Sequence, residues 1–90
     1  MQSDKLINIG KIIGVFGIKG ELKIYSESDF IDYRFRIGAH IYLKSKKIAK
    51  EAVVTSMRIH KKTILIQIDN LNDINLVSHY IGCDIYAKYE

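Results

Sequence analysis

Three histidines and one cysteine are the side chains of this sequence best suited to bind a transition metal. His40, His60 and His79 are far apart in the sequence, and only His79 is close to the single cysteine, Cys83. Gly82 interrupts any helical face that would bring those two side chains together. A zinc site normally has four protein ligands, or three and a water molecule. The sequence therefore predicts no metal site, and we interpret the histidines as solvent-exposed residues.

Catalytic and phosphate-binding motifs are also missing from the sequence. It has no G-x-S-x-G motif, no paired-carboxylate motif and no nucleophile with a recognisable base nearby. Gly10, Gly14, Gly17 and Gly20 are closely spaced, but they match neither G-x-x-x-x-G-K-[ST] nor G-x-G-x-x-G, and no helix is predicted after them. We therefore predict that the protein is not an enzyme and binds no cofactor.

Two short segments alternate aromatic and basic residues. They are Lys23-Ile24-Tyr25 and Tyr33-Arg34-Phe35-Arg36. Barrels that bind nucleic acids often present such residues on one face of a strand, where bases stack on the aromatic rings. The other interpretation is that these tyrosines are half-buried barrel residues whose hydroxyl groups reach water. The sequence leaves both interpretations open.

The totals indicate one small domain. The chain has 90 residues, 48% of them hydrophobic and 27% charged, with a net charge of +4 and a pI near 9.2. This mild excess of positive charge is compatible with a polyanionic partner. One cysteine permits no internal disulfide, which favours a reducing compartment. Lys11 and several glycines interrupt the apolar segment 6–18, so we expect a soluble cytoplasmic monomer that does not contact a membrane.

The elements that must position these residues are mostly strands. Alternating or β-branched apolar residues predict six of them: Leu6–Val15, Glu21–Ser26, His40–Lys44, Ala52–Ile59, Thr63–Ile68 and Asp84–Tyr89. Residues 44–47 are predicted to form a hairpin tip, and residues 26–29 a strand end followed by a loop. Phe30–Phe35 is compatible with either a short helical turn or an irregular loop.

One helix is predicted over residues 73–80. Asn72 or Asp73 can cap its first turn, and Gly82 is suited to the position just past its end. Ile74, Val77 and Ile81 would share one face at helical spacing. About six short strands and one helix in a chain of this length are typical of a small barrel or sandwich.

The glycine-rich opening is similar to the start of a known family. Residues 9–22 read IGKIIGVFGIKGEL, and residues 23–30 continue with KIYSESDF. The RimM family of bacterial ribosome maturation factors typically begins with hydrophobic-G-[KR]-[IV], a glycine, then an aromatic residue or histidine before G-[IV]-[KR]-G. Farther on, Arg58-Ile59-His60, residues 68–73 and Ile81-Gly82 resemble the family's basic segment, acidic turn and glycine, in the same order. The resemblance covers essentially the whole chain and only the family's N-terminal domain.

This resemblance implies a six-stranded antiparallel β-barrel with one short helix, of the type found in translation elongation factors and some flavin reductases. Full-length members add a C-terminal PRC-barrel domain, whose aromatic-rich opening has no counterpart here, so we expect residues 1–90 to be an excised domain or a truncated protein. The sequence departs from the family in two places. Ile74 takes the place of an arginine after the acidic turn, and Leu76 and Val77 replace small residues in the helix.

The resemblance also implies a function. Members of the family bind the immature small ribosomal subunit as non-catalytic assembly chaperones, and they assist assembly of its head and processing of 16S rRNA. Attachment to a ribosomal protein of the head is ascribed mainly to the second domain, and contact with rRNA is implied as well. We expect the contact residues in loops that meet at one end of the barrel; they are Phe16, Lys19, Arg58, His60, Lys61 and Lys62.

Two functions of the glycine segment remain open at this stage. Gly10 and Gly14 are predicted to permit a sharp bend of the first strand, and Gly17 and Gly20 to bracket a tight loop. That loop either presents a contact surface or serves only to close the barrel. Three other functions compete with the leading one, namely a generic barrel for single-stranded RNA, a module that binds only proteins and, more distantly, a flavin-dependent enzyme.

Overall fold

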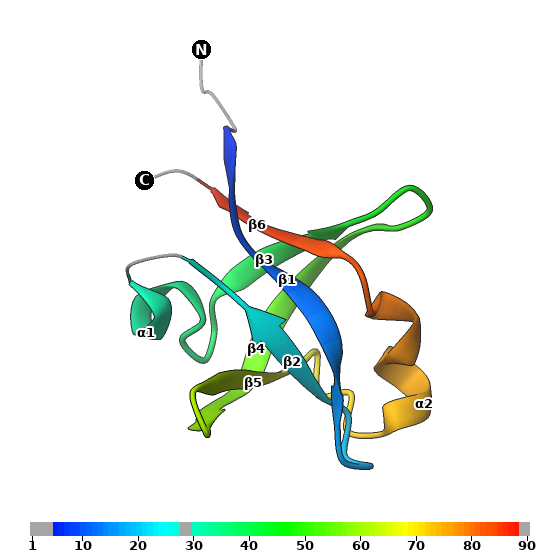
Figure 1. Ribbon diagram of the computed structural model, residues 1–90. Coiled ribbons are helices and arrows are strands. Elements are labelled where there is room, and N and C mark those ends of the chain that lie inside the picture. Colours follow the sequence, from blue (N-terminus) through cyan, green and yellow to red (C-terminus); the bar gives the residue numbers. More distant parts are fainter. Residues whose placement is uncertain (1–4, 28–29, 89–90) are drawn as a thin grey trace.

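The computed structural model describes residues 5–27 and 30–88, and Figure 1 shows the fold. Six strands form a closed barrel in the order β1-β2-β5-β4-β3-β6, with every neighbouring pair antiparallel. Their bounds are β1 (Leu6–Phe16), β2 (Glu21–Tyr25), β3 (His40–Lys44), β4 (Ala49–His60), β5 (Thr63–Ile68) and β6 (Asp84–Lys88). This confirms the predicted fold class. The predicted loop residues Ser28 and Asp29, and Tyr89 of the last predicted strand, lie outside the described residues.

The core consists of the side chains that point into the barrel from alternate strand positions. Leu22, Ile41, Ile66 and Ile85 are fully buried, as are most of their inward-facing neighbours. Burial of such side chains stabilises a fold by roughly 1.5–3 kcal/mol each. Phe35, from the loop before β3, is also fully buried and belongs to the same cluster. The barrel is therefore filled, and any binding surface must lie on its outside.

β1 bends strongly because it pairs with β6 along its first half and with β2 along its second half. The register shifts between Asn8 and Gly10 in the pairing with β6, and between Ile12 and Gly14 in the pairing with β2. A β-carbon on Gly10 would lie 2.8 Å from the carbonyl oxygen of Tyr25, so the backbones approach too closely there for another residue. These shifts let one strand turn a corner of the barrel.

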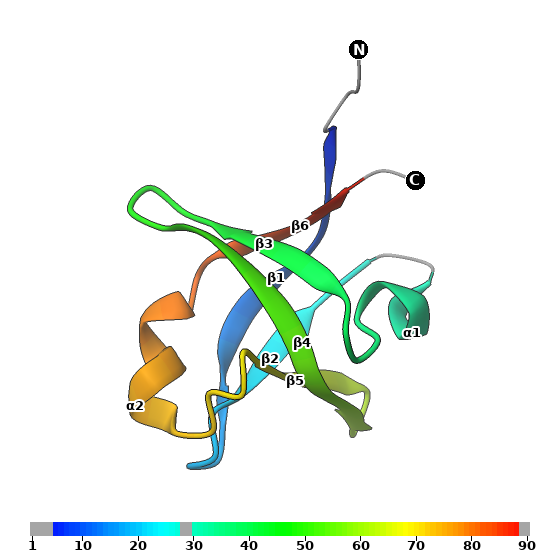
Figure 2. The ribbon, with the colours of Figure 1, turned by 180° about the vertical axis from the view of Figure 1, so that it is seen from behind.

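Helical turns lie on two sides of the barrel (Figures 1 and 2). α1 (Ile31–Arg34) shows that the segment Phe30–Phe35 contains a short helical turn. The predicted helix over residues 73–80 is α2 (Ile74–Val77) followed by the 3-10 helix η1 (Ser78–Tyr80). The Asp73 carboxylate caps α2 by accepting a hydrogen bond from the N–H of Asn75 at 2.8 Å.

One detail of the predicted helix is wrong. Ile81 was expected to share one face of the helix with Ile74 and Val77, but Val77 is fully buried while the side chain of Ile81 is 48% exposed. The chain tightens from α2 into η1, so the angle between successive side chains increases and the helical spacing no longer holds. Tyr80 is buried instead and packs in the core cluster beside Val77.

Candidate functional site

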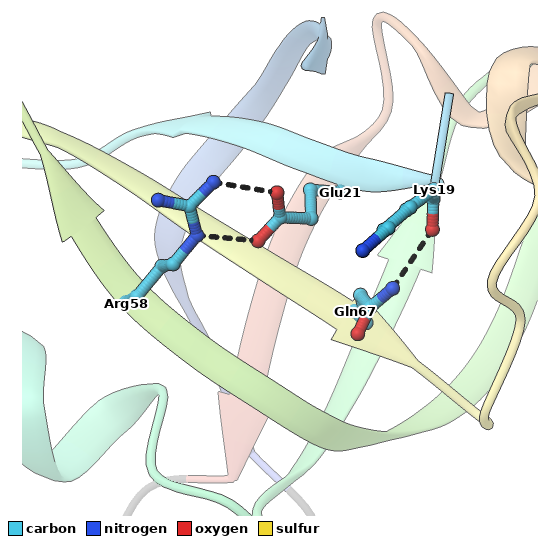
Figure 3. Close-up of polar contacts among 4 residues, drawn as sticks. All are labelled: Lys19, Glu21, Arg58 and Gln67. Carbon is cyan, nitrogen blue, oxygen red and sulfur yellow. Dashed lines mark hydrogen bonds and ion pairs between the residues drawn. The ribbon is translucent and has the colours of Figure 1, made fainter. Parts of the chain in front are cut away.

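An ion pair on the outside of the barrel joins two strands that are not neighbours. Arg58 of β4 donates from Nε to Glu21 Oε2 at 2.7 Å and from Nη2 to Oε1 at 2.8 Å. Glu21 is the first residue of β2, and β5 lies between the two strands, so the pair spans β5 (Figure 3). Two parallel hydrogen bonds from one guanidinium fix the orientation of both side chains.

The environment of Glu21 favours its charged form. The hydrogen bond from Arg58 lowers the pKa of the Glu21 carboxyl below its usual value, and this effect exceeds that of burial, which raises it. Lys19 and His60 add smaller effects in the same direction. The same pairing raises the pKa of Arg58. Both groups therefore stay charged at neutral pH, and Glu21 offsets part of the positive charge of this surface.

The ring of Phe16 contacts Arg58 and His60, two residues of β4 that were predicted to contact the ribosome or RNA. Its centroid lies 5.0 Å from that of the His60 ring, with the planes tilted by 49°. The guanidinium carbon of Arg58 lies 5.4 Å from the same ring centroid, which is within the range of a cation–π contact. The last residue of β1 is thus held against β4 by two contacts through its ring.

Leu65 forms the floor beneath these side chains. It points out of the barrel, between the inward-facing Ile64 and Ile66, yet it is fully buried. A hollow of about 260 Å³ opens above it, lined by Phe16, Lys23, His60, Lys61, Thr63 and Leu65. We call this surface, with the turns at both ends of β5, the outer-face site; its residues are Phe16, Lys19, Glu21, Lys23, Arg58, His60, Lys61, Lys62, Leu65 and Gln67.

The turn between β4 and β5 places two lysines in an unusual conformation. Lys61 and Lys62 have φ values of +50° and +69°. A two-residue hairpin turn of type I′ requires positive φ at both positions, and asparagine and glycine are the residues that adopt it easily. Lysine has a β-carbon that clashes in this region, which costs about 1 kcal/mol or more per residue. Both side chains are exposed.

Lys19 lies at the other end of β5. Its carbonyl oxygen accepts a hydrogen bond from Gln67 Nε2 at 2.8 Å, and its side chain extends over the outer face toward Glu21 (Figure 3). The register pairs Leu22 with Ile66 and Ile24 with Ile64, so the turn before β2 and the turn before β5 lie at opposite ends of β5. The expectation that these loops meet at one end of the barrel is wrong. The side chains of Phe16 and Arg58 connect the two regions across the strands instead.

Several residues of the outer-face site were not predicted. They are Glu21, Leu65 and Gln67, and only Leu65 left a signal in the sequence, while Lys23 was considered only as part of the segment Lys23-Ile24-Tyr25. The run Ile64-Leu65-Ile66 does not alternate between apolar and polar residues, which indicates that side chains cover both faces of that strand. The partner of Arg58 could not be identified, because the pair joins residues 37 positions apart.

The described residues contain no group of three or more His, Cys, Asp or Glu side chains that could hold a metal ion. His79 packs its ring 4.0 Å from that of Tyr80, and Cys83 is buried. Within the same residues, no helix has the length and apolar character needed to cross a membrane.

A known protein family matches almost the whole chain. Residues 7–90 match the family model of the RimM N-terminal domain. The chain is 40% identical over 82 residues to a protein of Limosilactobacillus fermentum named ribosome maturation factor RimM, and 36% identical over 82 residues to a Staphylococcus aureus protein of the same name. These alignments cover 90% and 91% of this chain but 48% and 49% of the relatives. The chain therefore spans about half the length of the curated relatives it matches.

Solved structures show the same fold. A putative 16S ribosomal RNA processing protein RimM from Pseudomonas aeruginosa superposes with a TM-score of 0.79 at 29% identity, over 91% of this chain and 49% of that one. The N-terminal domain of RimM from Thermus thermophilus superposes with a TM-score of 0.74, over 93% of this chain and 89% of that one. At 15% identity, this second likeness concerns the fold alone. The family model, the curated relatives and the barrel together show that this chain belongs to the RimM N-terminal domain family.

Proposed function

We propose that this chain is the part of a cytoplasmic ribosome maturation factor that contacts RNA of the immature small subunit. It acts there as a non-catalytic chaperone that assists assembly of the head and processing of 16S rRNA. Family membership supports the general role. The contact with RNA is supported by the outer-face site, where an aromatic ring, a guanidinium and exposed lysines lie on one surface.

The chemistry of the outer-face site suits a folded RNA. Lys61, Lys62 and Lys19 present ammonium groups that attract phosphates without reading sequence. The rings of Phe16 and His60 border the hollow over Leu65, where an unstacked base can pack against an aromatic face. Glu21 orients Arg58 and also lowers the net positive charge of the site. We therefore expect the site to bind a folded RNA of complementary shape more tightly than an unstructured polyanion.

A sedimentation experiment tests this proposal. The 90-residue chain is incubated with immature and with mature small subunits, at low and at physiological salt, and the bound fraction is measured. We expect preferential binding to immature particles, and loss of that binding in a Lys19→Ala/Arg58→Ala variant. The matched control is Lys46→Ala/Lys47→Ala, which removes the same charge from the exposed tip of the β3–β4 hairpin. Equal loss in both variants, or no binding at either salt, would contradict the proposal.

A purely protein-binding module is the second candidate, because one observation favours it. Ile18 is 79% exposed and lies in the turn between β1 and β2, so this apolar side chain contributes little to the stability of the fold. Binding through Ile18 would depend little on salt and would be lost in an Ile18→Ser variant, while Lys19→Ala/Arg58→Ala would leave it unchanged.

In longer relatives, we propose that attachment to a ribosomal protein of the head lies mainly outside the matched half.

A further inference from the structure

The wall of the barrel formed by β3 and β6 has features that the proposed function does not use. In the ring of strands, β6 is diametrically opposite β5, so this wall faces away from the outer-face site. Tyr42 of β3 and Tyr86 of β6 are direct cross-strand partners, and both point outward because Ile41, Leu43 and Ile85 fill the core. Two half-buried aromatic rings therefore lie side by side in the middle of a strand face.

Basic residues surround these two tyrosines. The Lys44 ammonium lies 5.7 Å from the centre of the Tyr86 ring. On the other side of Tyr42, a groove of about 400 Å³ is lined by Arg34, Arg36 and Lys88, among other residues. Among the described residues, the acidic side chains beside these tyrosines are Glu51 of β4, which accepts a hydrogen bond from His40 at 3.2 Å, and Asp84, the first residue of β6. The described basic side chains here outnumber these two acidic ones.

The arginines of this groove differ from Arg58 in their pairing. Among residues 5–27 and 30–88, Arg34 and Arg36 form no ion pair, whereas Arg58 is paired with Glu21. Arg36 stacks on the Tyr33 ring, with 4.1 Å between its guanidinium carbon and the ring centroid, and donates from Nη1 to the Tyr33 carbonyl oxygen at 2.7 Å. This arrangement fixes the plane of the guanidinium and leaves its other N–H groups for a ligand.

The backbone beneath the groove is fixed by the core. Phe35 is fully buried and holds the segment that carries Arg34 and Arg36. The N–H of Gly38 donates to the Val54 carbonyl oxygen at 2.7 Å, and the N–H of Val54 donates to the Ala39 carbonyl oxygen at 2.9 Å. A surface that is rigid before binding loses little conformational entropy when a ligand arrives.

We infer that the β3–β6 wall binds a single-stranded RNA segment, with bases stacked on Tyr42 and Tyr86 and phosphates held by Arg34 and Arg36. Aromatic platforms in the middle of a strand face, flanked by cations that follow the backbone, are how barrels bind single strands. A guanidinium held against an aromatic ring is a further surface on which a base packs. This inference rests on the proposed function only in taking RNA as the partner, and it adds a second contact on the opposite wall.

An oligonucleotide experiment tests this inference apart from the ribosome. A fluorescent single-stranded RNA of about ten nucleotides, without self-complementarity, is titrated with the 90-residue chain at about 0.1 M salt, and anisotropy gives the affinity. We expect Arg34→Ala/Arg36→Ala to weaken binding by on the order of tenfold and to reduce the salt slope. The control Lys46→Ala/Lys47→Ala should change affinity by less than about twofold, since the hairpin tip lies outside the wall.

Tyrosine variants test the stacking itself. Tyr42→Leu/Tyr86→Leu keeps apolar area on the wall but removes the aromatic rings, and binding should weaken by on the order of tenfold. NMR of the unsubstituted protein with RNA should show upfield shifts of these ring protons. Equal weakening by the hairpin-tip control, or equal binding of a polyglutamate peptide, would overturn the inference, since the wall would then attract charge alone.

Different experimental outcomes would contradict the two proposals. Oligonucleotide binding that survives Arg34→Ala/Arg36→Ala but is lost in Lys61→Asn/Lys62→Gly would overturn the inference and leave the outer-face site intact. Oligonucleotide binding that follows the predicted pattern, without any binding to immature subunits, would contradict the proposed function and support the inference.

Discussion

The guanidinium of Arg58 directs two hydrogen bonds, of 2.7 and 2.8 Å, at the single carboxylate of Glu21. Residues of β4 and β2 are thereby joined over β5, a strand that neither of the two residues belongs to. An internal contact therefore orients the guanidinium, and it determines where Arg58 can point toward a partner.

Acid should reveal this ion pair in the stability of the protein. Because Arg58 lowers the pKa of Glu21 below its ordinary value of 4.5, the folded protein releases this proton more readily than the unfolded chain. The stabilisation is complete above pH 4.5 and is lost as the pH falls through the depressed folded pKa. Urea unfolding from pH 7 to pH 2 should show the difference in unfolding free energy between the unsubstituted protein and Glu21→Gln shrinking over that window. When Glu21→Gln is made in the Arg58→Ala variant instead, this pH dependence should largely disappear. If the pH-dependent difference in unfolding free energy persists there, the pH dependence comes from a partner of Glu21 other than Arg58.

Relief of the strained turn should separate stability from binding. Lys61→Asn/Lys62→Gly places residues that accept positive φ where two lysines now adopt it, so the unfolding free energy should rise by about 1–2 kcal/mol. Urea unfolding measures the gain, and sedimentation with immature subunits should show weaker binding of the same variant.

The matched control for the turn is Lys46→Asn/Lys47→Gly in the β3–β4 hairpin. Neither of these lysines has a positive φ, and Ser45 Oγ accepts hydrogen bonds from the N–H groups of Lys47 and Ile48. This change should bring no stabilisation. A similar gain in both hairpins would mean that removal of charge, and not relief of strain, stabilises the protein.

Gly20 and Gly17 should respond differently to the same substitution. Both have positive φ, +77° and +70°, but a β-carbon on Gly20 would lie 3.0–3.1 Å from backbone atoms of Leu71 and Asp73, while one on Gly17 would meet nothing within 4 Å. Gly17→Ala should cost only the conformational penalty of about 1 kcal/mol. Gly20→Ala adds a backbone clash and should cost about 2–4 kcal/mol. Thermal and urea unfolding of both variants measure this, and equal costs would show that the 71–73 segment moves away without penalty.

Leu65→Ala should destabilise the protein although Leu65 lies outside the barrel core. The side chain is fully buried beneath Phe16 and its neighbours, so its truncation should cost about 2–4 kcal/mol. The exposed Ile81 serves as the comparison, since Ile81→Ala should cost about 0.5 kcal/mol or less. A cost for Leu65→Ala as small as that for Ile81→Ala would mean that the outer-face site is too loosely packed to hold Phe16 in place.

The strands could be predicted from the sequence where their side chains alternate. His40–Lys44 and Thr63–Ile68 have the predicted bounds, and the hairpin tip between β3 and β4 lies where the polar run placed it. β4 begins at Ala49, three residues before the predicted start, because its first residues pair with β3 through backbone hydrogen bonds that do not depend on apolar side chains. Hydrophobic patterns report burial, and they miss the parts of a strand that are paired but exposed.

The candidate site was less predictable than the fold. Phe16, Arg58 and His60 were predicted as contact residues and lie together, but the reason is the register of the four strands β1, β2, β5 and β4, which the sequence alone does not reveal. The role of Lys19 as a carbonyl acceptor for Gln67 depends on the same register. The aromatic and basic segment at residues 33–36 divides between two environments, since Phe35 enters the core while Tyr33 supports Arg36 on the surface. Chain-distant contacts of this kind follow only from the closed barrel.

The closed ring also has a consequence for synthesis of the chain. The pairing of Leu6 with Lys88 joins β1 to β6, so the ring cannot close until the residues of β6 have been translated. Contacts between such distant residues slow folding, because a long loop must be ordered before they form. Until β6 arrives, β1 and β3 each have an unpaired strand edge, which is a template for pairing with other chains. The nascent domain therefore remains prone to aggregation until its last strand leaves the ribosome, and closure by β6 is the step that ends this exposure.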